Sequence, residues 1–341
     1  MKKTLIVLAV GLSLAAAAHA QDDKPPAPRF TWLKLGGEFR ARGEATSHMG
    51  FVTGVGDGYY LNRVRLNAAI QARPWLSVFV EGQDARAPGF NDRSALAGLE
   101  NRFDFRQAYV QVGNPERGWQ LRAGRQELAL GEERLVGADN YWDPLGRSWD
   151  AARLSYQTPN LRLDWFSAWL VAPDPRRMDR LSGGDRLHGF YAVLPRAPGG
   201  VRVEPYFLFD ELTRRFLRGD RWIPNRVYTP GARVYGDLPR RFDYNIEMAW
   251  QRGVSAGETV SAWAGHWEAG YKLNGDDNSP RIAGEYNFAS GDGHPDDGRH
   301  TTFDDLHPAG YNKFGMSDPF AWRNIRLAAG SVEWPLTRGW R

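Results

Sequence analysis

The sequence contains no cysteine among its 341 residues. Disulfides and thiolate metal sites, which support many small exported domains, are therefore excluded. Beyond residue 20 the sequence also lacks an apolar run approaching the roughly 18 residues that a membrane-spanning helix requires. A chain of this length without these supports is expected to rely on one large sheet, either in a soluble protein or in a β-barrel.

Motifs for common enzyme and cofactor sites are missing as well. There is no Gly-x-Ser-x-Gly, no HExxH, no phosphate-binding loop and no dinucleotide fingerprint, and the seven histidines are scattered. We therefore expect no cofactor and no enzymatic activity. One enzymatic alternative stays open, an outer-membrane hydrolase whose residues meet only in space, with the candidates Ser94, Ser148, His188 and His294.

Strong net charge is also absent. The formal charge of +4 falls to +2 when Lys2 and Lys3 are removed, so the sequence does not indicate a nucleic-acid partner. All but six of the 44 basic residues are arginine. The planar guanidinium group binds carboxylates and phosphates through paired hydrogen bonds, which points to anionic ligands.

The N-terminus has the pattern of an export signal. Residues 1–20 combine two lysines, an apolar run and Ala18-His19-Ala20, the order found in a cleaved secretory signal. Residues 21–30 are rich in proline and form a flexible leader. The remaining residues, 31–341, are expected to form a single β-barrel domain.

Alternating apolar and polar residues run through this domain. In Leu33–Arg42 and in Tyr60–Ala72 the period is two, which predicts strands with one apolar and one polar face. About fourteen such strands can be counted. Their connections alternate between short turns and long loops, the long ones at 43–58, 87–102, 128–147, 172–185, 211–225 and 291–321.

Short turns on one rim and long loops on the other are typical of an antiparallel transmembrane outer-membrane β-barrel. The short turns would then be periplasmic and the long loops extracellular. Tryptophan and tyrosine near the predicted strand ends fit aromatic girdles at the two membrane interfaces. A soluble β-sandwich or propeller is the alternative fold.

If the apolar face meets lipid, the polar face lines an aqueous lumen. That face carries many arginines beside carboxylates, and a wall of this kind predicts a weak to moderate preference for anions. Pairing among these charges could equally be structural. The arginines predicted from the strand pattern are Arg40, Arg42, Arg63, Arg65, Arg122, Arg153 and Arg281.

Acidic loop residues offer a weaker hypothesis. Asp292, Asp296 and Asp297 lie in a glycine-rich loop and could supply oxygen ligands to Ca²⁺. Aspartate and glycine also simply form turns, and the run lacks the spacing of a complete calcium loop. We therefore expect no metal site here.

Two stretches of sequence resemble the alginate export family of outer-membrane barrels. The first runs from Gly124-Arg125-Gln126-Glu127-Leu128 through Gly131-Glu132-Glu133-Arg134 to Trp149-Asp150-Ala151-Ala152-Arg153-Leu154. The second is Tyr286-Asn287-Phe288-Ala289-Ser290-Gly291-Asp292 followed by Thr302-Phe303-Asp304-Asp305-Leu306-His307-Pro308. Carried over from the first stretch, Arg125, Arg134 and Arg153 would be lumen or loop arginines, with Asp150 as a partner.

The resemblance implies a monomeric barrel of 16–18 strands that passes an anionic polysaccharide through an electropositive pore. A general porin for small sugar or aromatic acids is the alternative. Because only about fourteen strands are counted, we expect the domain to be incomplete at its C-terminus, where Leu336–Arg341 would begin a further strand. An open seam would then separate the strand at Leu33 from the strand at Trp334.

Overall fold

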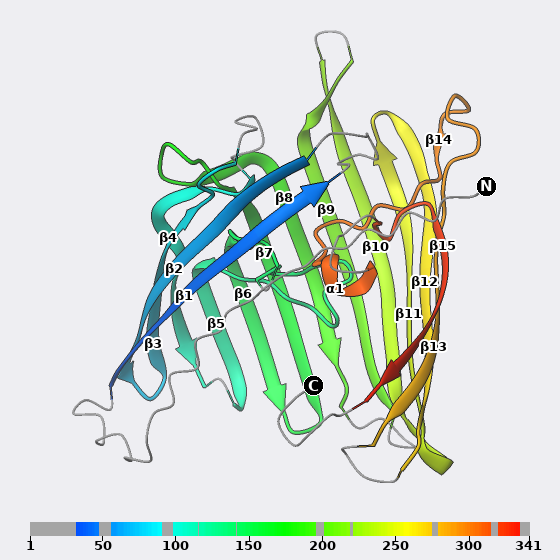
Figure 1. The fold of residues 1–341 in the computed structure, drawn as a ribbon, viewed down its shortest axis with the longest axis horizontal. Helices are drawn as coiled ribbons and strands as arrows, with labels where there is room; N and C mark the ends of the chain where they lie inside the picture. The colour runs from blue at the N-terminus through cyan, green and yellow to red at the C-terminus, as the bar shows by residue number, and fades with distance from the viewer. Residues whose placement is uncertain are drawn as a thin grey trace.

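The strands form one antiparallel sheet that follows the order of the chain. The computed structural model describes residues 32–47, 56–90, 98–114, 116–140, 142–195, 201–218, 221–274, 279–314 and 320–334. Each long strand pairs with the next from β1 to β13, and β15 pairs with β13. The sheet curves around an interior that contains the short helix α1 (Figure 1). A sandwich of two sheets and a propeller of separate blades are therefore both wrong.

The strands are β1 (Leu33–Ser47), β2 (Gly56–Arg73), β3 (Leu76–Arg86), β4 (Asn101–Gly113), β5 (Gly118–Gln126), β6 (Trp149–Thr158), β7 (Leu161–Ala172), β8 (Arg180–Val193), β9 (Arg202–Arg218), β10 (Arg221–Leu238), β11 (Phe242–Ser255), β12 (Glu258–Lys272), β13 (Arg281–Ala289), β14 (Arg299–His300) and β15 (Ile325–Glu333). Helix α1 spans Tyr311–Phe314. A 3₁₀ turn, Pro239–Arg241, joins β10 to β11.

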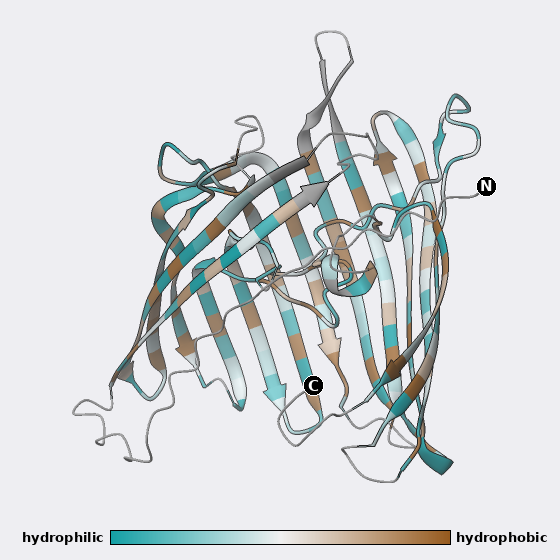
Figure 2. Cartoon of the chain, in the orientation of Figure 1, coloured by the Kyte–Doolittle hydropathy of each residue, from teal (hydrophilic) through white to brown (hydrophobic). Residues whose placement is uncertain are grey.

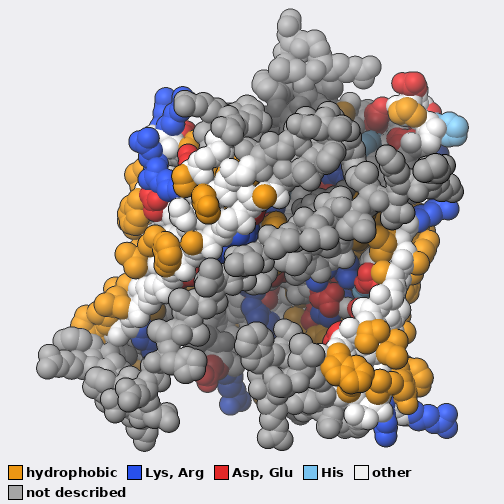
Figure 3. Space-filling view, in the orientation of Figure 1, with side chains coloured by type: hydrophobic (Ala, Val, Ile, Leu, Met, Phe, Trp, Pro, Cys, Tyr) orange, Lys and Arg blue, Asp and Glu red, His pale blue; other side chains and the backbone are white. Residues whose placement is uncertain are grey.

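The two faces of the sheet have the predicted character. On β2, Leu66 is 62% exposed, whereas its neighbour Arg65 is 6% exposed. Polar and apolar residues alternate along the strands (Figure 2), and apolar side chains gather on the outer sides of the sheet (Figure 3). Exposed apolar and buried polar residues reverse the arrangement of a soluble protein and match a barrel whose outer face meets lipid.

The loop predicted at 211–225 is wrong. Strand β9 continues to Arg218 and β10 begins at Arg221, and the two remain paired across this region with one register shift near Ile223. Residues 219 and 220, between the two strands, lie outside the described residues. The hairpin therefore lengthens instead of opening into a loop.

The two edges of the sheet are β1 and β15. Within the described ranges, β1 pairs only with β2, and β15 pairs only with β13. The predicted signal at 1–20, the leader at 21–30 and the last predicted strand start at 336–341 lie outside the described residues. In the part of the chain that is described, no helix is long and apolar enough to cross a membrane.

Candidate functional site: a lumen crossed by two loops

Two long connections fold inward and join each other. One is 127–148, between β5 and β6, and the other is 301–314, which follows β13 and includes α1. Val136 forms a parallel bridge with His307, and the Ala309 amide donates to the Glu133 carbonyl oxygen at 2.9 Å. Leu128, Val136 and Phe303 are each at most 1% exposed. We call these two segments the inner layer.

Arg147 fastens the inner layer at its centre. Its Nη1 donates to three main-chain oxygens, those of Gly137 at 2.8 Å, His307 at 2.6 Å and Pro308 at 3.0 Å. Burial lowers the pKa of the Arg147 guanidinium, and nearby carboxylates such as Asp139 oppose that shift. A buried arginine that satisfies several carbonyl groups is a strong, directional clamp.

Arginines of β1, β2 and β4 hold one side of the inner layer. Arg42 donates to the Trp142 oxygen at 2.7 Å, and Arg63 donates to the oxygens of Asn140 at 3.1 Å and Asp143 at 3.2 Å. A fourth carbonyl oxygen, that of Leu145, accepts hydrogen bonds from Arg65, Arg106 and Gln83. These four arginines, the arginine wall, are Arg42, Arg63, Arg65 and Arg106.

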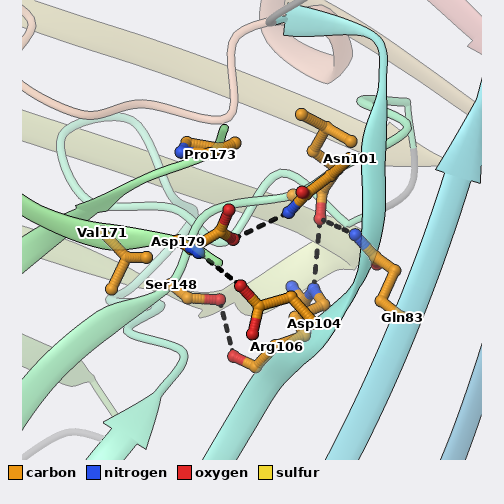
Figure 4. Close-up of a pocket in the computed structure, with 10 residues that line it drawn as sticks. Gln83, Asn101, Asp104, Arg106, Ser148, Val171, Pro173 and Asp179 are labelled. Carbon is orange, nitrogen blue, oxygen red and sulfur yellow. Dashed lines mark hydrogen bonds between the residues drawn. The ribbon is translucent and has the colours of Figure 1, made fainter. Parts of the chain in front are cut away.

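Figure 4 shows how tightly this anchor is packed. Gln83 and Arg106 point at the loop, and the Ser148 hydroxyl donates to the Arg106 main-chain oxygen at 2.8 Å. Beside them, the Asn101 amide donates to the Asp179 carboxylate at 2.7 Å. The side chains leave a cavity of about 20 Å³, which has room for about one water molecule.

On the other side, acids and tyrosines of β8–β11 bond to one another around Arg233, which holds the inner layer. Tyr191 and Tyr235 donate to Glu204 at 2.6 and 2.9 Å, and Tyr206 donates to Glu247 at 3.0 Å. Glu132 of the inner layer accepts a hydrogen bond from Arg233 at 2.7 Å. The loop 127–148 therefore crosses the lumen, from the arginine wall to the strands that lie across from it in Figure 1.

Glu132 sits at the centre of this second anchor. Its other partners are Asn245, which donates at 2.7 Å, and Lys313 of α1, whose Nζ lies 3.7 Å away. Burial would raise the pKa of the Glu132 carboxyl, but Lys313, Arg233 and Arg134 outweigh it and lower that pKa. Burial lowers the pKa of the Lys313 ammonium. Glu132 is therefore held as a carboxylate.

The structure also locates the other predicted arginines. Arg153 binds Asp164 at 2.9 Å, and Arg281 binds Asp243 and Glu268, each at 2.6 Å. Arg40 lies opposite Arg63 in the β1–β2 register. Most of these lumen arginines have a carboxylate or carbonyl partner, so their first role is structural.

Arg125 and Arg134 lie in different settings. Arg125 and its partner Asp150, 2.8 Å away, lie in register on β5 and β6. They share the alternation of the exposed residues Leu121 and Leu154, so they belong to the outward face and not to the lumen. Arg134 is buried in the inner layer, 3.5 Å from the Asn287 oxygen.

Arg122 differs because its only hydrogen-bond partner in the described chain is neutral. It donates to the Gln111 oxygen at 2.8 and 3.1 Å, and its guanidinium lies 4.5 Å above the Tyr109 ring. Tyr109 stacks on Phe79 with ring centres 5.4 Å apart. In the sequence of β3, Phe79 interrupts the polar positions Ser77, Glu81 and Gln83, and this interruption is the signal for an aromatic residue inside the lumen.

These side chains line a recess of about 340 Å³ near the short-turn rim, which we call the cationic recess. Its lining contains two cations, Lys34 and Arg122, and none of the described residues that line it is acidic. Within the described ranges Lys34 has no carboxylate partner. The cationic recess therefore keeps positive charge available to a ligand beside two aromatic faces.

The remaining predicted residues do not come together. Ser148 is engaged with Arg106, His188 pairs with Ser167 on another strand at 2.9 Å, and His294 lies in an exposed loop. Ser94 lies outside the described residues. The calcium candidates Asp292 and Asp297 accept turn hydrogen bonds from the amides of His294 and Arg299, and with Asp296 they form no group of converging ligands among the described residues.

A single antiparallel sheet with an apolar outer face and a polar lumen crossed by loops defines an outer-membrane channel. Comparison with known families identifies the family to which this channel belongs. The alginate export model matches residues 31–339, nearly the whole chain, so the chain belongs to the alginate export family.

The chain is similar to several solved structures at low sequence identity. OccK11 (OpdR) from Pseudomonas aeruginosa is 14% identical, with a TM-score of 0.54 over 85% of this chain and 70% of that chain. OmpF from Salmonella typhi is 12% identical, with a TM-score of 0.37 over 88% and 96% of the two chains. An anion-selective porin from Comamonas acidovorans is 11% identical, with a TM-score of 0.35 over 76% and 88%. A search of curated proteins gives no match.

Proposed function

We propose that this outer-membrane channel passes anionic solutes, with carboxylates drawn through the lumen by its unneutralised cations. The observation that carries the proposal is the cationic recess, where Lys34 and Arg122 lie beside Phe79 and Tyr109 without an acidic neighbour in the lining. A carboxylate can bind the two cations while the ring of a sugar or an aromatic acid packs on the aromatic faces.

A second recess, on the inner layer, has related chemistry. Its volume is about 310 Å³, and three cations, Arg134, Arg147 and Lys313, face two acids, Asp139 and Asp305. Burial raises the pKa of the Asp305 carboxyl, although Arg323 opposes the shift. An anion would therefore meet cations on the inner layer as well as near the short-turn rim.

The family resemblance favours an anionic polysaccharide as the cargo, and the inner layer favours small acids. A loop anchored to opposite walls narrows the lumen, and its clamps leave little freedom for a polymer to thread past it. Of the two cargo classes, small sugar or aromatic acids fit this arrangement better. We further propose a monomer, exported with cleavage of residues 1–20.

Flux into liposomes tests the proposal. The channel is reconstituted and uptake is compared for glucose, glucuronate, benzoate and a uronic acid oligomer. We expect glucuronate and benzoate to enter faster than glucose, and the oligomer to enter slowly or to block. Equal rates for glucose and glucuronate would contradict anion passage, whereas rapid entry of the oligomer would restore the polysaccharide as cargo.

A further inference from the structure

Three potential ligands converge on the lumen face of β12 and β13. They are the His266 imidazole and the carboxylates of Glu268 and Glu285, and their ligand atoms all lie within 4.8 Å of one another. Glu268 and Glu285 are directly opposite in the β12–β13 register. His266 is 0% exposed, and its Nε2 has no hydrogen-bond partner.

Asn287 sets the tautomer of His266. The Asn287 Oδ1 lies 2.8 Å from His266 Nδ1 and 3.5 Å from the Arg134 guanidinium, which can only donate. Because the guanidinium can only donate, the Asn287 side-chain atom that it contacts is the amide oxygen, which accepts. The His266 Nδ1 beside that oxygen therefore carries the hydrogen and donates it. In the neutral ring, Nε2 is then left as a bare acceptor, and a hydrogen bond to the other ring nitrogen is how metal-binding histidines are oriented.

The acceptor Nε2 points at further acceptors. The Glu268 Oε2 lies 3.7 Å from it, close to the edge of about 3.4 Å that separates two ligands of a tetrahedral zinc ion. Arg281 occupies the other oxygen of Glu268 at 2.6 Å. Glu285 has no hydrogen bond or ion pair within the described residues and is only half-buried. Converging acceptors of this kind require a cation among them.

The surrounding charge permits a dication. Glu247 lies opposite His266 in the β11–β12 register. Arg134 lies 3.9 Å from Glu247, and Arg281 is shared between Asp243 and Glu268. Glu285 is therefore the carboxylate of this cluster that no ion pair neutralises within the described residues. The half-buried Glu285 gives access from the lumen. One imidazole nitrogen and two carboxylate oxygens suit zinc and its first-row neighbours better than calcium, which takes six to eight oxygen ligands.

We infer that His266, Glu268 and Glu285 form a binding site for a first-row divalent cation, of which zinc is the type case, on the lumen wall. Solvent would complete the coordination from the lumen side. This site is separate from the cationic recess, so the inference does not depend on which solute the channel passes.

Zinc binding to tag-free protein, folded in detergent, tests the inference. A chromophoric chelator competes for ZnCl₂ with the wild type and with the His266→Gln and Glu285→Gln variants. We expect about one zinc per wild-type chain. Because each variant loses a ligand, its affinity should fall by at least the roughly 10-fold to 100-fold that loss of a ligand's hydrogen-bond partner costs. The matched control His294→Gln, in an exposed loop, should bind as the wild type does.

Heat-modifiable migration on a gel selects the folded fraction of each variant before the titration. Glu285→Gln removes no described contact, so it keeps the test valid even if His266→Gln fails to fold. Absence of zinc binding to the wild type would overturn the inference and leave a protonated imidazole as the cation. Unchanged affinity in folded Glu285→Gln, or competition by CaCl₂ at equal concentration, would also overturn it.

Discussion

Arg147 donates to the main-chain oxygen of His307 at 2.6 Å, which ties together two loops that are 160 residues apart in the chain. The same guanidinium nitrogen also donates to the oxygens of Gly137 and Pro308, so one side chain joins both segments of the inner layer. The constriction of the lumen is therefore a polar clamp between loops, and it can be released without altering a strand.

Releasing that clamp should open the channel. Arg147→Met removes a donor from three carbonyl oxygens, of which that of His307 still accepts the Gly137 amide at 2.8 Å. The loss should weaken the inner layer by about 2–3 kcal/mol. We expect a larger single-channel conductance with more current noise in planar bilayers. The control Arg117→Met alters an exposed arginine in the turn between β4 and β5 and should conduct as the wild type does. Identical traces for the two variants would mean that the inner layer does not limit the current.

Acid should loosen the same layer from its other anchor. The pKa of Glu132 is lowered from its ordinary value of 4.5, so its stabilising effect is complete above that value and is lost as the pH falls through the lower folded pKa. Current noise should rise as the pH is taken from 6 toward about 3. Glu132→Gln should be noisy at pH 6 already and change less. A wild-type pH profile in Glu132→Gln would assign the titration to another group.

Gly137 allows the two inner-layer loops to approach each other. A Cβ at this position would lie 2.7 Å from the Ala309 amide nitrogen and 2.8 Å from the Glu133 carboxylate. Gly137→Ala should therefore push the loops apart, costing about 1–3 kcal/mol, and increase the conductance. Gly293→Ala, where a Cβ would meet nothing within 4 Å, is the matched control. If Gly137→Ala leaves the conductance unchanged, the two loops must lie farther apart than they do in this structure.

The exposed apolar face makes a separate prediction. Leu66→Arg puts a charge on the outer face of β2 and should destabilise folding into lipid vesicles by about 2–4 kcal/mol if the residue lies near the bilayer midplane. Asn67→Arg alters the next residue, on the lumen face, and should cost much less. Equilibrium unfolding in guanidinium chloride measures both. Equal losses would mean that the faces of β2 have been assigned the wrong way round.

The strands and their faces could be predicted because a period of two is a local property. The contrast between Arg65 and Leu66 is already visible in the sequence of β2. Arg125 shows the limit: its likeness to a family motif suggested the lumen, whereas its register with Asp150 places it on the outward face. The hairpin at Arg218 and Arg221 was missed because its turn signal is only two residues long.

The site itself was less accessible to sequence. Arg42, Arg63 and Arg65 of the arginine wall lie on the face that the strand pattern made polar, whereas Arg106 was missed. Their carbonyl partners in 140–145 leave no trace in residue type. Contacts such as Arg147 with His307 join distant loops, and no local pattern records them. His266 and Glu285 lie far apart in sequence and meet only through strand pairing, so the scattered histidines gave no ligand array.

Reversal potentials in a KCl gradient test the central claim most directly, namely that Lys34 and Arg122 give the lumen its preference for anions. The reversal potential of the wild type should lie toward the equilibrium potential of chloride. Lys34→Gln with Arg122→Gln should move the reversal potential toward potassium without the conductance rise expected for Arg147→Met. A wild type that reverses on the potassium side, or a double variant with unchanged selectivity, would contradict the account.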